Sequence, residues 1–173
     1  LSKIEAGKLR IDAVPMDPAG VLEDVAQLFA ERAQSKGLAL VCDVAPGVPS
    51  HVVGDPVRLR QVLGNLVGNA IKFTHRGHVL LRLEVVAAGP PVATLRYTVR
   101  DTGIGIPAAA REHIFDAFTQ GDGGTTRRFG GTGLGLTISR DLVALMGGHL
   151  GVDSVEGDGS QFSCDLPLAM PDD

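Results

Sequence analysis

Two apolar runs of strand character follow one another in the middle of the chain, and they limit the folds open to it. In each run the apolar residues recur at every second position, at Val79, Leu81, Leu83 and Val85 and then at Leu95, Tyr97 and Val99. This period predicts half-buried strands, and Pro90-Pro91 between the runs predicts a hairpin turn. An antiparallel hairpin among separate helices favours a two-layer α/β sandwich over a doubly wound parallel sheet.

The rest of the chain alternates between helical and extended patterns. Asp55-Pro56 predicts the start of a long amphipathic helix, as a cap residue followed by a first-turn proline. The expected helices span 19–36, 55–73, 107–116 and 134–146, with the tail of another helix at 1–9. The other expected strands span 38–44, 149–155 and 160–167.

Charge and composition exclude several classes of protein. The 173 residues include 16 Lys and Arg against 20 Asp and Glu, and this net charge of −4 argues against non-specific nucleic-acid binding. No apolar run approaches the roughly 18 residues that a membrane span requires. Cys42 and Cys164 are too few for a disulfide framework, so both are expected to be small core residues in a reducing compartment. The first residues show no basic-then-apolar pattern, so the chain is expected to lack a signal peptide and to be part of a longer protein.

A stripe of amide side chains lies on one face of the expected helix 55–73. Gln61, Asn65 and Asn69 are spaced by four and share a face, and Lys72 and Phe73 follow at its end. Asparagine is unfavourable inside a helix, so its presence there calls for a reason. The stripe is either the solvated face of the helix or a set of neutral oxygen ligands for Mg²⁺ beside phosphate groups.

A carboxylate stands at the end of the second hairpin strand. Asp101 precedes a Gly-x-Gly turn at 103–105, where it can accept the amino protons of adenine but not pair with the O6 acceptor of guanine. The segment therefore indicates a preference for ATP over GTP. Two other interpretations stay open, a polar turn that only ends the strand and a G-x-G-x-x-A dinucleotide loop over residues 103–108. The dinucleotide loop is disfavoured because it should follow a parallel strand.

Glycine is concentrated in one short part of the chain. Seven of the 23 glycines fall within residues 121–135, and the segment that starts at Arg127-Arg128 runs directly into the expected helix 134–146. Backbone N–H groups at a glycine-rich helix start form an anion site, and adjacent arginines add positive charge. The segment is a candidate phosphate-binding loop, although it does not match the Walker A pattern.

Taken in this order, the segments resemble the ATP-binding catalytic domain of bacterial sensor histidine kinases, in the GHKL superfamily with its Bergerat fold. The sequence is most similar to hybrid-type kinases. The resemblance covers the N box at 55–74, the G1 box at 101–105, the F box at 114–118 and the G2 box at 131–135. It implies a mixed, mostly antiparallel sheet with helices on one face and a glycine-rich ATP lid at about 116–134. It also implies two parts, with residues 1–12 ending a dimerisation and phosphoacceptor helix and residues 13–173 forming the ATP-binding domain.

The resemblance assigns roles to individual positions. Asn69 would ligate Mg²⁺, and Asn65 would help to hold the metal or the phosphates. Lys72 would contact phosphate, Phe73 would line the nucleotide site, and Asp101 would bind the adenine amino group. The other positions would shape the base pocket (Gly103, Gly105, Ile106), reach the γ-phosphate (Arg127 or Arg128), wrap the phosphates (Gly131, Gly133, Gly135) and otherwise bind the nucleotide (Thr132, Leu134). Phe115 and Phe118 would anchor the lid, and for Phe115 plain core packing stays open as the alternative.

The reaction follows from the same resemblance. Related ATPases carry a general-base Glu four residues before the metal-binding Asn, and here Asn65 stands there with an amide that cannot take the proton. Hydrolysis is therefore expected to be slow, and the γ-phosphoryl group is expected to pass to a His on a dimerisation domain and later to a response-regulator receiver domain. None of the five histidines opens the acceptor sequence, so the chain is expected to bind Mg-ATP without phosphorylating itself.

Two other functions stay open. One is an ATP-hydrolysing or clamp-type superfamily member, against which Asn65 and the acidic charge argue. The other is a degenerate kinase that only binds, against which Asn69, Asp101 and the G2 box argue. The isolated chain is expected to be monomeric, within the cytoplasmic portion of a homodimeric kinase. The histidines are expected in loops (His51, His75), at strand starts (His78, His149) and in a short helix (His113).

Overall fold

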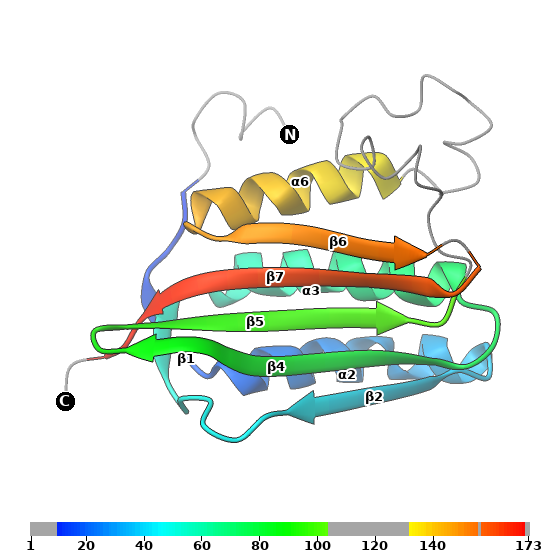
Figure 1. The fold of residues 1–173 in the computed structure, drawn as a ribbon, viewed down its shortest axis with the longest axis horizontal. Coiled ribbons are helices and arrows are strands. Elements are labelled where there is room, and N and C mark those ends of the chain that lie inside the picture. Colours follow the sequence, from blue (N-terminus) through cyan, green and yellow to red (C-terminus); the bar gives the residue numbers. More distant parts are fainter. Residues whose placement is uncertain (1–9, 104–131, 156, 172–173) are drawn as a thin grey trace.

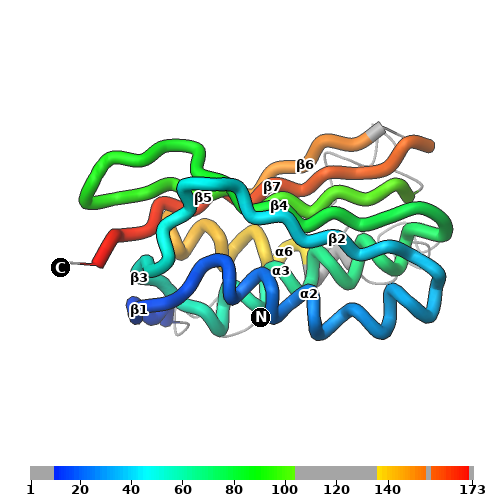
Figure 2. Tube along the Cα trace, turned by 90° about the horizontal axis from the view of Figure 1, so that it is seen from below, coloured from blue at the N-terminus to red at the C-terminus, as the bar shows by residue number. Residues whose placement is uncertain are grey.

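The chain folds into a sheet whose one face is covered by helices. The computed structural model describes residues 10–103 and 132–171, apart from residue 156. Within these residues the helices are α2 (Pro18–Ser35), α3 (Pro56–Phe73) and α6 (Thr132–Leu145). Seen edge-on, the sheet lies on one side and all these helices lie on the other (Figure 2). The predicted two-layer α/β sandwich is confirmed.

The sheet is mixed and mostly antiparallel, as predicted. Its strands are β1 (Val14–Met16), β2 (Ala39–Val44), β3 (Val52–Gly54), β4 (His78–Gly89), β5 (Val92–Asp101), β6 (His149–Val155) and β7 (Gly159–Ala169). Their order is β1-β3-β7-β5-β4-β2, and β6 also pairs with β7. Among the strands that the structure describes, only β2 and β4 run parallel, and every other pair is antiparallel. No helix in the described part of the chain is long and apolar enough to cross a membrane.

The predicted hairpin forms the middle of the sheet. β4 and β5 pair with Leu83 opposite Tyr97, and both side chains are fully buried under the helices. β5 also pairs with β7 along its whole length, from Val92 opposite Ala169 to Asp101 opposite Ser160. The end of β5 is therefore held by neighbours on both sides, which makes it a rigid place for a functional side chain.

Helix α3 lies between α2 and α6 (Figure 1). Its cap is Asp55, which is buried and accepts a hydrogen bond from the backbone N–H of Arg58 at 3.0 Å, as the sequence predicts. The predicted apolar stripe is buried in full, at Leu59, Val62, Leu63, Leu66, Val67, Ala70 and Ile71. Because this stripe covers the sheet, the stripe with Asn65 and Asn69 lies away from the sheet, where both residues are half-buried.

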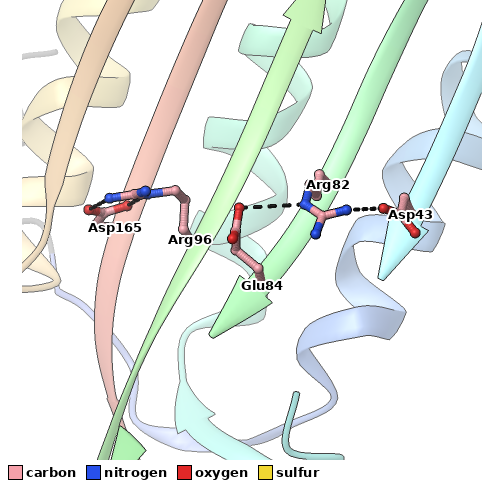
Figure 3. Close-up of polar contacts among 5 residues, drawn as sticks. All are labelled: Asp43, Arg82, Glu84, Arg96 and Asp165. Atoms are coloured by element: carbon pink, nitrogen blue, oxygen red, sulfur yellow. Dashed lines mark hydrogen bonds and ion pairs between the residues drawn. The ribbon is translucent and has the colours of Figure 1, made fainter. Parts of the chain in front are cut away.

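The face of the sheet without helices carries rows of charged side chains. Arg82 pairs with Asp43 of β2 and with Glu84 at 3.5 Å, and Arg96 binds Asp165 of β7 through two hydrogen bonds of 2.7 and 3.0 Å (Figure 3). These partly exposed pairs each contribute at most about 1 kcal/mol. Their position shows that the polar positions of the strands lie on the open face, as the alternation predicts.

The structure differs from the sequence predictions in two places. β1 and β3, three residues each, pair with one another and were not predicted, because so short a strand shows no period. Cys164 is buried, and burial raises the pKa of its thiol to about 12, but Cys42 is exposed and the expectation of a core position was wrong. Cys42 lies on β2, an edge strand on which no residue is fully buried. The expected helices 1–9 and 107–116 lie outside the described residues.

Candidate functional site

Three segments that carry predicted site residues meet at one end of the molecule. The C-terminal end of α3, the end of β5 and the start of α6 all lie at the right of Figure 1. α3 packs against both α6 and β5. The fold thus brings to one end of the molecule the end of the amide-bearing helix, the end of the strand with the carboxylate and the glycine-rich helix start, which lie far apart in the sequence.

A groove of about 550 Å³ runs between α2 and α3 beside the amide stripe. It contains three of the predicted phosphate and metal residues, Asn65, Asn69 and Lys72. Its other lining residues are Phe29 and Arg32 of α2, Lys36 at the C-terminal cap of α2, and Gly64, Gly68 and Ile71 of α3. Gln61, the first member of the predicted stripe, is not among them, and its side chain accepts a hydrogen bond from Arg58 at 3.3 Å. The groove combines amide oxygens with cationic side chains, a set that suits Mg²⁺-bound phosphate.

Helix α2 supplies cations that sequence reasoning missed. Lys36 donates through Nζ to the carbonyl oxygens of Ile71 at 2.6 Å and Lys72 at 3.1 Å, so its charge lies at the C-terminal end of α3. Arg32 lies over the ring of Phe29, 4.9 Å from its centroid. Neither has a local sequence signal, because the contact depends on how α2 packs against α3.

Lys72 and Phe73 form a pair at the end of α3. The Lys72 side chain is exposed, and its Nζ lies 5.8 Å from the centroid of the half-buried Phe73 ring. This distance is within the range of a cation–π contact. Lys72 lies at the groove with this aromatic ring beside its charge.

Asp101 is held at the end of β5 by backbone N–H groups. The side chain is 7% exposed, and its Oδ1 accepts from Gly103 N at 2.9 Å and from Ser160 N at 3.3 Å. Neither bond uses Oδ2, which is therefore the oxygen available to accept from a ligand. Burial raises the pKa of the carboxyl above its ordinary value, and the two N–H groups lower it in part.

Two serines continue from Asp101 across the sheet in one row. Asp101 lies opposite Ser160 of β7, and Ser160 lies opposite Ser154 of β6. Both serines are buried, their Oγ atoms lie 2.9 Å apart, and Ser154 Oγ donates to the carbonyl of Gly159 at 3.0 Å. The sequence shows no sign of this row, because the strand register alone brings the three residues together.

Gly103 fits where a larger residue does not. A Cβ at Gly103 would lie 2.5 Å from the carbonyl oxygen of Phe73 and 2.9 Å from Asp101 Oδ1. This close approach links the strand-end turn to the end of α3 and supports the predicted role of Gly103 in shaping a pocket. The next residue of the chain after Phe73 is Thr74, whose fully buried Oγ1 has no hydrogen-bond partner in the described part of the chain. An unmatched hydroxyl beside this turn fits a pocket that a polar ligand completes.

The glycine-rich segment is described only in part. Thr132, Gly133, Leu134 and Gly135 form the first turn of α6, so their backbone N–H groups lie at a helix start, as predicted. Six predicted positions and the lid anchors lie outside the described residues, namely Gly105, Ile106, Arg127, Arg128, Gly131, His113, Phe115 and Phe118. The other histidines lie as predicted, with His51 and His75 in loops and His78 and His149 at strand starts.

Metal binding at this site would differ from that of a carboxylate or histidine cage. Among the described residues no three His, Cys, Asp or Glu side chains come close enough to hold a metal ion together. The oxygen ligands at the groove belong to neutral amides, so the positive charge of a bound cation would have to be balanced by an anionic ligand. Phosphate oxygens meet that need, and Mg²⁺ characteristically binds few protein ligands beside phosphates and waters.

Comparison with known proteins identifies the family to which this chain belongs. Residues 54–170 match the family model described as "Histidine kinase-, DNA gyrase B-, and HSP90-like ATPase". The chain is 46% identical over 173 residues to the sensor protein GacS of Pseudomonas syringae pv. syringae, covering 99% of this chain and 19% of that protein. Other relatives include a protein named as a hybrid histidine kinase. The chain thus spans about a fifth of the length of the first curated relatives that it matches.

Solved structures show the same fold. Full-length ShkA, in complex with AMPPNP, superposes with a TM-score of 0.84 at 37% identity, covering 99% of this chain and 34% of that one. A nucleotide-free catalytic domain of the histidine kinase ThkA superposes with a TM-score of 0.73 at 25% identity, covering 90% of this chain and 95% of that one. The fold is that of histidine kinase catalytic domains, the Bergerat fold.

Proposed function

The chain belongs to the histidine kinase-, DNA gyrase B- and HSP90-like ATPases, and on that premise we propose that it binds Mg-ATP and donates the γ-phosphoryl group to a histidine on a dimerisation domain. The observation that carries the proposal is the geometry of Asp101. Its carboxylate is buried at a rigid strand end, with Oδ1 used by the backbone and Oδ2 left for a ligand. AMPPNP, an ATP analogue, is bound by the similar protein ShkA.

Asp101 selects the base. A carboxylate oxygen accepts a hydrogen bond from the adenine 6-amino group. The 6-oxo group of guanine is itself an acceptor, so it cannot form a hydrogen bond with the carboxylate. A hydrogen bond to a charged group is worth about 1.5–3 kcal/mol, and an unmatched buried acceptor adds a penalty of its own. Gly103 lets the turn after β5 approach the carbonyl of Phe73 at the end of α3, which forms one side of the base pocket, and the Phe73 ring supplies an apolar edge.

The groove side of α3 binds the phosphates. Asn69 and Asn65 offer neutral amide oxygens to Mg²⁺, and Lys72 offers a cation to the phosphate oxygens. When bound, Mg²⁺ would neutralise negative charge that develops on the transferred γ-phosphoryl group. The first turn of α6 directs backbone N–H groups at the same end of the molecule, where they attract an anion. We place Arg127 or Arg128 at the γ-phosphate, and Gly105, Ile106 and Gly131 around the nucleotide.

The residue at position 65 decides what accepts the phosphoryl group. An asparagine amide has no lone pair basic enough to take a proton from an attacking water near neutral pH. The γ-phosphoryl group therefore remains on the nucleotide until a better nucleophile reaches it. We assign that role to a histidine on a dimerisation domain of the same kinase, to which residues 1–12 connect. The full-length kinase acts as a homodimer, with this domain in the cytoplasm, and passes the phosphoryl group to a receiver domain.

Labelling with γ-³²P-ATP tests this proposal. The chain is mixed with a separately prepared dimerisation domain of the same kinase, and label is expected on the histidine of that domain and not on this chain. Asn69→Ala is the matched control, because it removes an amide oxygen from the groove without adding charge, and it should abolish most of the labelling. Label on this chain alone contradicts the missing acceptor. ATP binding without any transfer to the added domain favours a scaffold that only binds.

A further inference from the structure

Ser139 is a polar residue on the buried side of α6. Its side chain is fully buried, and the nearby helix positions Leu136, Leu142 and Val143 are buried apolar residues of the core. A buried hydroxyl is costly unless it has a hydrogen-bond partner. The partner therefore indicates why a serine stands at this position.

That partner is Asn65 of the amide stripe. Asn65 donates through Nδ2 to Ser139 Oγ at 3.1 Å, across the contact between α3 and α6 and over 74 positions of sequence. Nδ2 and Oδ1 diverge from the same planar amide carbon, so a bond that holds Nδ2 against α6 leaves Oδ1 directed elsewhere. Asn65 also lines the groove between α3 and α2, on the side opposite to α6. A bond in this direction is compatible with an amide oxygen directed toward the groove that contains Asn69 and Lys72.

We propose that Ser139 is a positioning residue that fixes the amide of Asn65 with its oxygen toward the metal and phosphates. The inference rests on the proposed function and goes beyond it, because it assigns a role to a residue that touches neither ATP nor metal. It also gives a physical link between the two parts of the phosphate site. The same helix that presents Thr132–Gly135 at its start holds Asn65 two turns later, so a shift of α6 moves the amide as well.

A double-mutant cycle with calorimetry tests the role of Ser139. Ser139→Ala is expected to weaken binding of Mg-ATP by about three- to tenfold, the usual range for one hydrogen bond, and to leave ATP binding in EDTA unchanged. In the Asn65→Ala background the same change should have no further effect on Mg-ATP binding, because the residue that Ser139 positions is gone. Val143→Ala, one turn further along α6, is the control, since it removes buried carbon atoms and no hydrogen bond.

Each possible result supports or overturns the proposed role of Ser139. A loss of affinity that appears equally in Mg²⁺ and in EDTA, or that persists in the Asn65→Ala background, means that Ser139 acts only through packing and overturns the inference. Mg-ATP binding by Ser139→Ala at the strength of the unmodified chain overturns it too and leaves the proposed function intact. Failure of the unmodified chain to bind ATP overturns both. The side-chain amide signals of Asn65, followed by NMR without nucleotide, should shift in Ser139→Ala and report the bond independently of binding.

Discussion

A chain in which Asp101 is replaced by asparagine is expected to bind ATP about ten- to hundred-fold more weakly and yet to remain at least as stable at pH 7. The loss of affinity follows because the amide cannot supply a charged acceptor to the adenine amino group. The two structural bonds survive, because both fall on Oδ1, and an asparagine oxygen can accept them from Gly103 and Ser160. Calorimetry with ATP and GTP, together with urea unfolding, measures both effects.

The sign of the stability effect comes from the direction of the Asp101 pKa. Burial raises this pKa in the folded state above its value in the unfolded chain, so the ionised carboxylate costs stability at neutral pH. The contribution of Asp101 to stability is complete below the unfolded pKa and is lost as the pH rises through the folded pKa. A neutral amide removes this cost at pH 7.

Asp43→Asn is the control for the charge change. Asp43 is a partly exposed residue on the open face of the sheet, paired with Arg82 and remote from the end of β5. Removing such a pair should change stability by less than about 1 kcal/mol and leave nucleotide affinity unchanged. Unchanged ATP affinity in Asp101→Asn, or a loss of stability with affinity preserved, would contradict the role of Asp101 as the base-reading residue.

Gly159→Ala is expected to have the largest effect on stability, about 3 kcal/mol or more. Gly159 has a φ of 111°, a region that alanine rarely adopts, and a Cβ there would lie 2.1 Å from the carbonyl oxygen of Asp101. The clash involves backbone on both sides, so no side-chain rotation relieves it. The end of β5 must move, and ATP affinity should fall together with the free energy of unfolding measured in urea.

Gly157→Ala separates backbone strain from the clash. Gly157 has a φ of 90°, but a Cβ there would have no atom within 4 Å. Its substitution should cost only the strain of a left-handed alanine, about 1–2 kcal/mol, and should spare ATP affinity. Equal losses of stability in the two variants would show that the approach of Gly159 to Asp101 has no energetic importance.

Local sequence patterns predicted helices and strands well where the whole pattern lies within one helix or one hairpin. The hairpin at β4 and β5 and the helix from Asp55 to Phe73 have strong periods and clear start signals, and both form as expected. Patterns failed where position in the sheet decides the outcome. Cys42 has a strand pattern like that of Cys164, and only the sheet order shows that β2 is an edge.

The site was predictable to the extent that its chemistry is local. Asp101 before its glycine turn and the amides of α3 are visible as motifs, and the fold brings the turn after β5 against the end of α3, at Phe73. Their supporting residues are not visible in the sequence. Ser139 reaches Asn65 only because α6 packs beside α3, and Ser160 reaches Asp101 only through the register of β5 and β7.

The most direct test of the account is a crystal structure of this chain with AMPPNP and Mg²⁺. We expect the 6-amino group of the base within hydrogen-bond distance of Asp101 Oδ2, and the phosphates between Asn69, Lys72 and the first turn of α6. Mg²⁺ should carry the Asn69 amide oxygen among its ligands. A purine bound anywhere other than at the end of β5, or triphosphate that avoids the amide side of α3, would contradict the account.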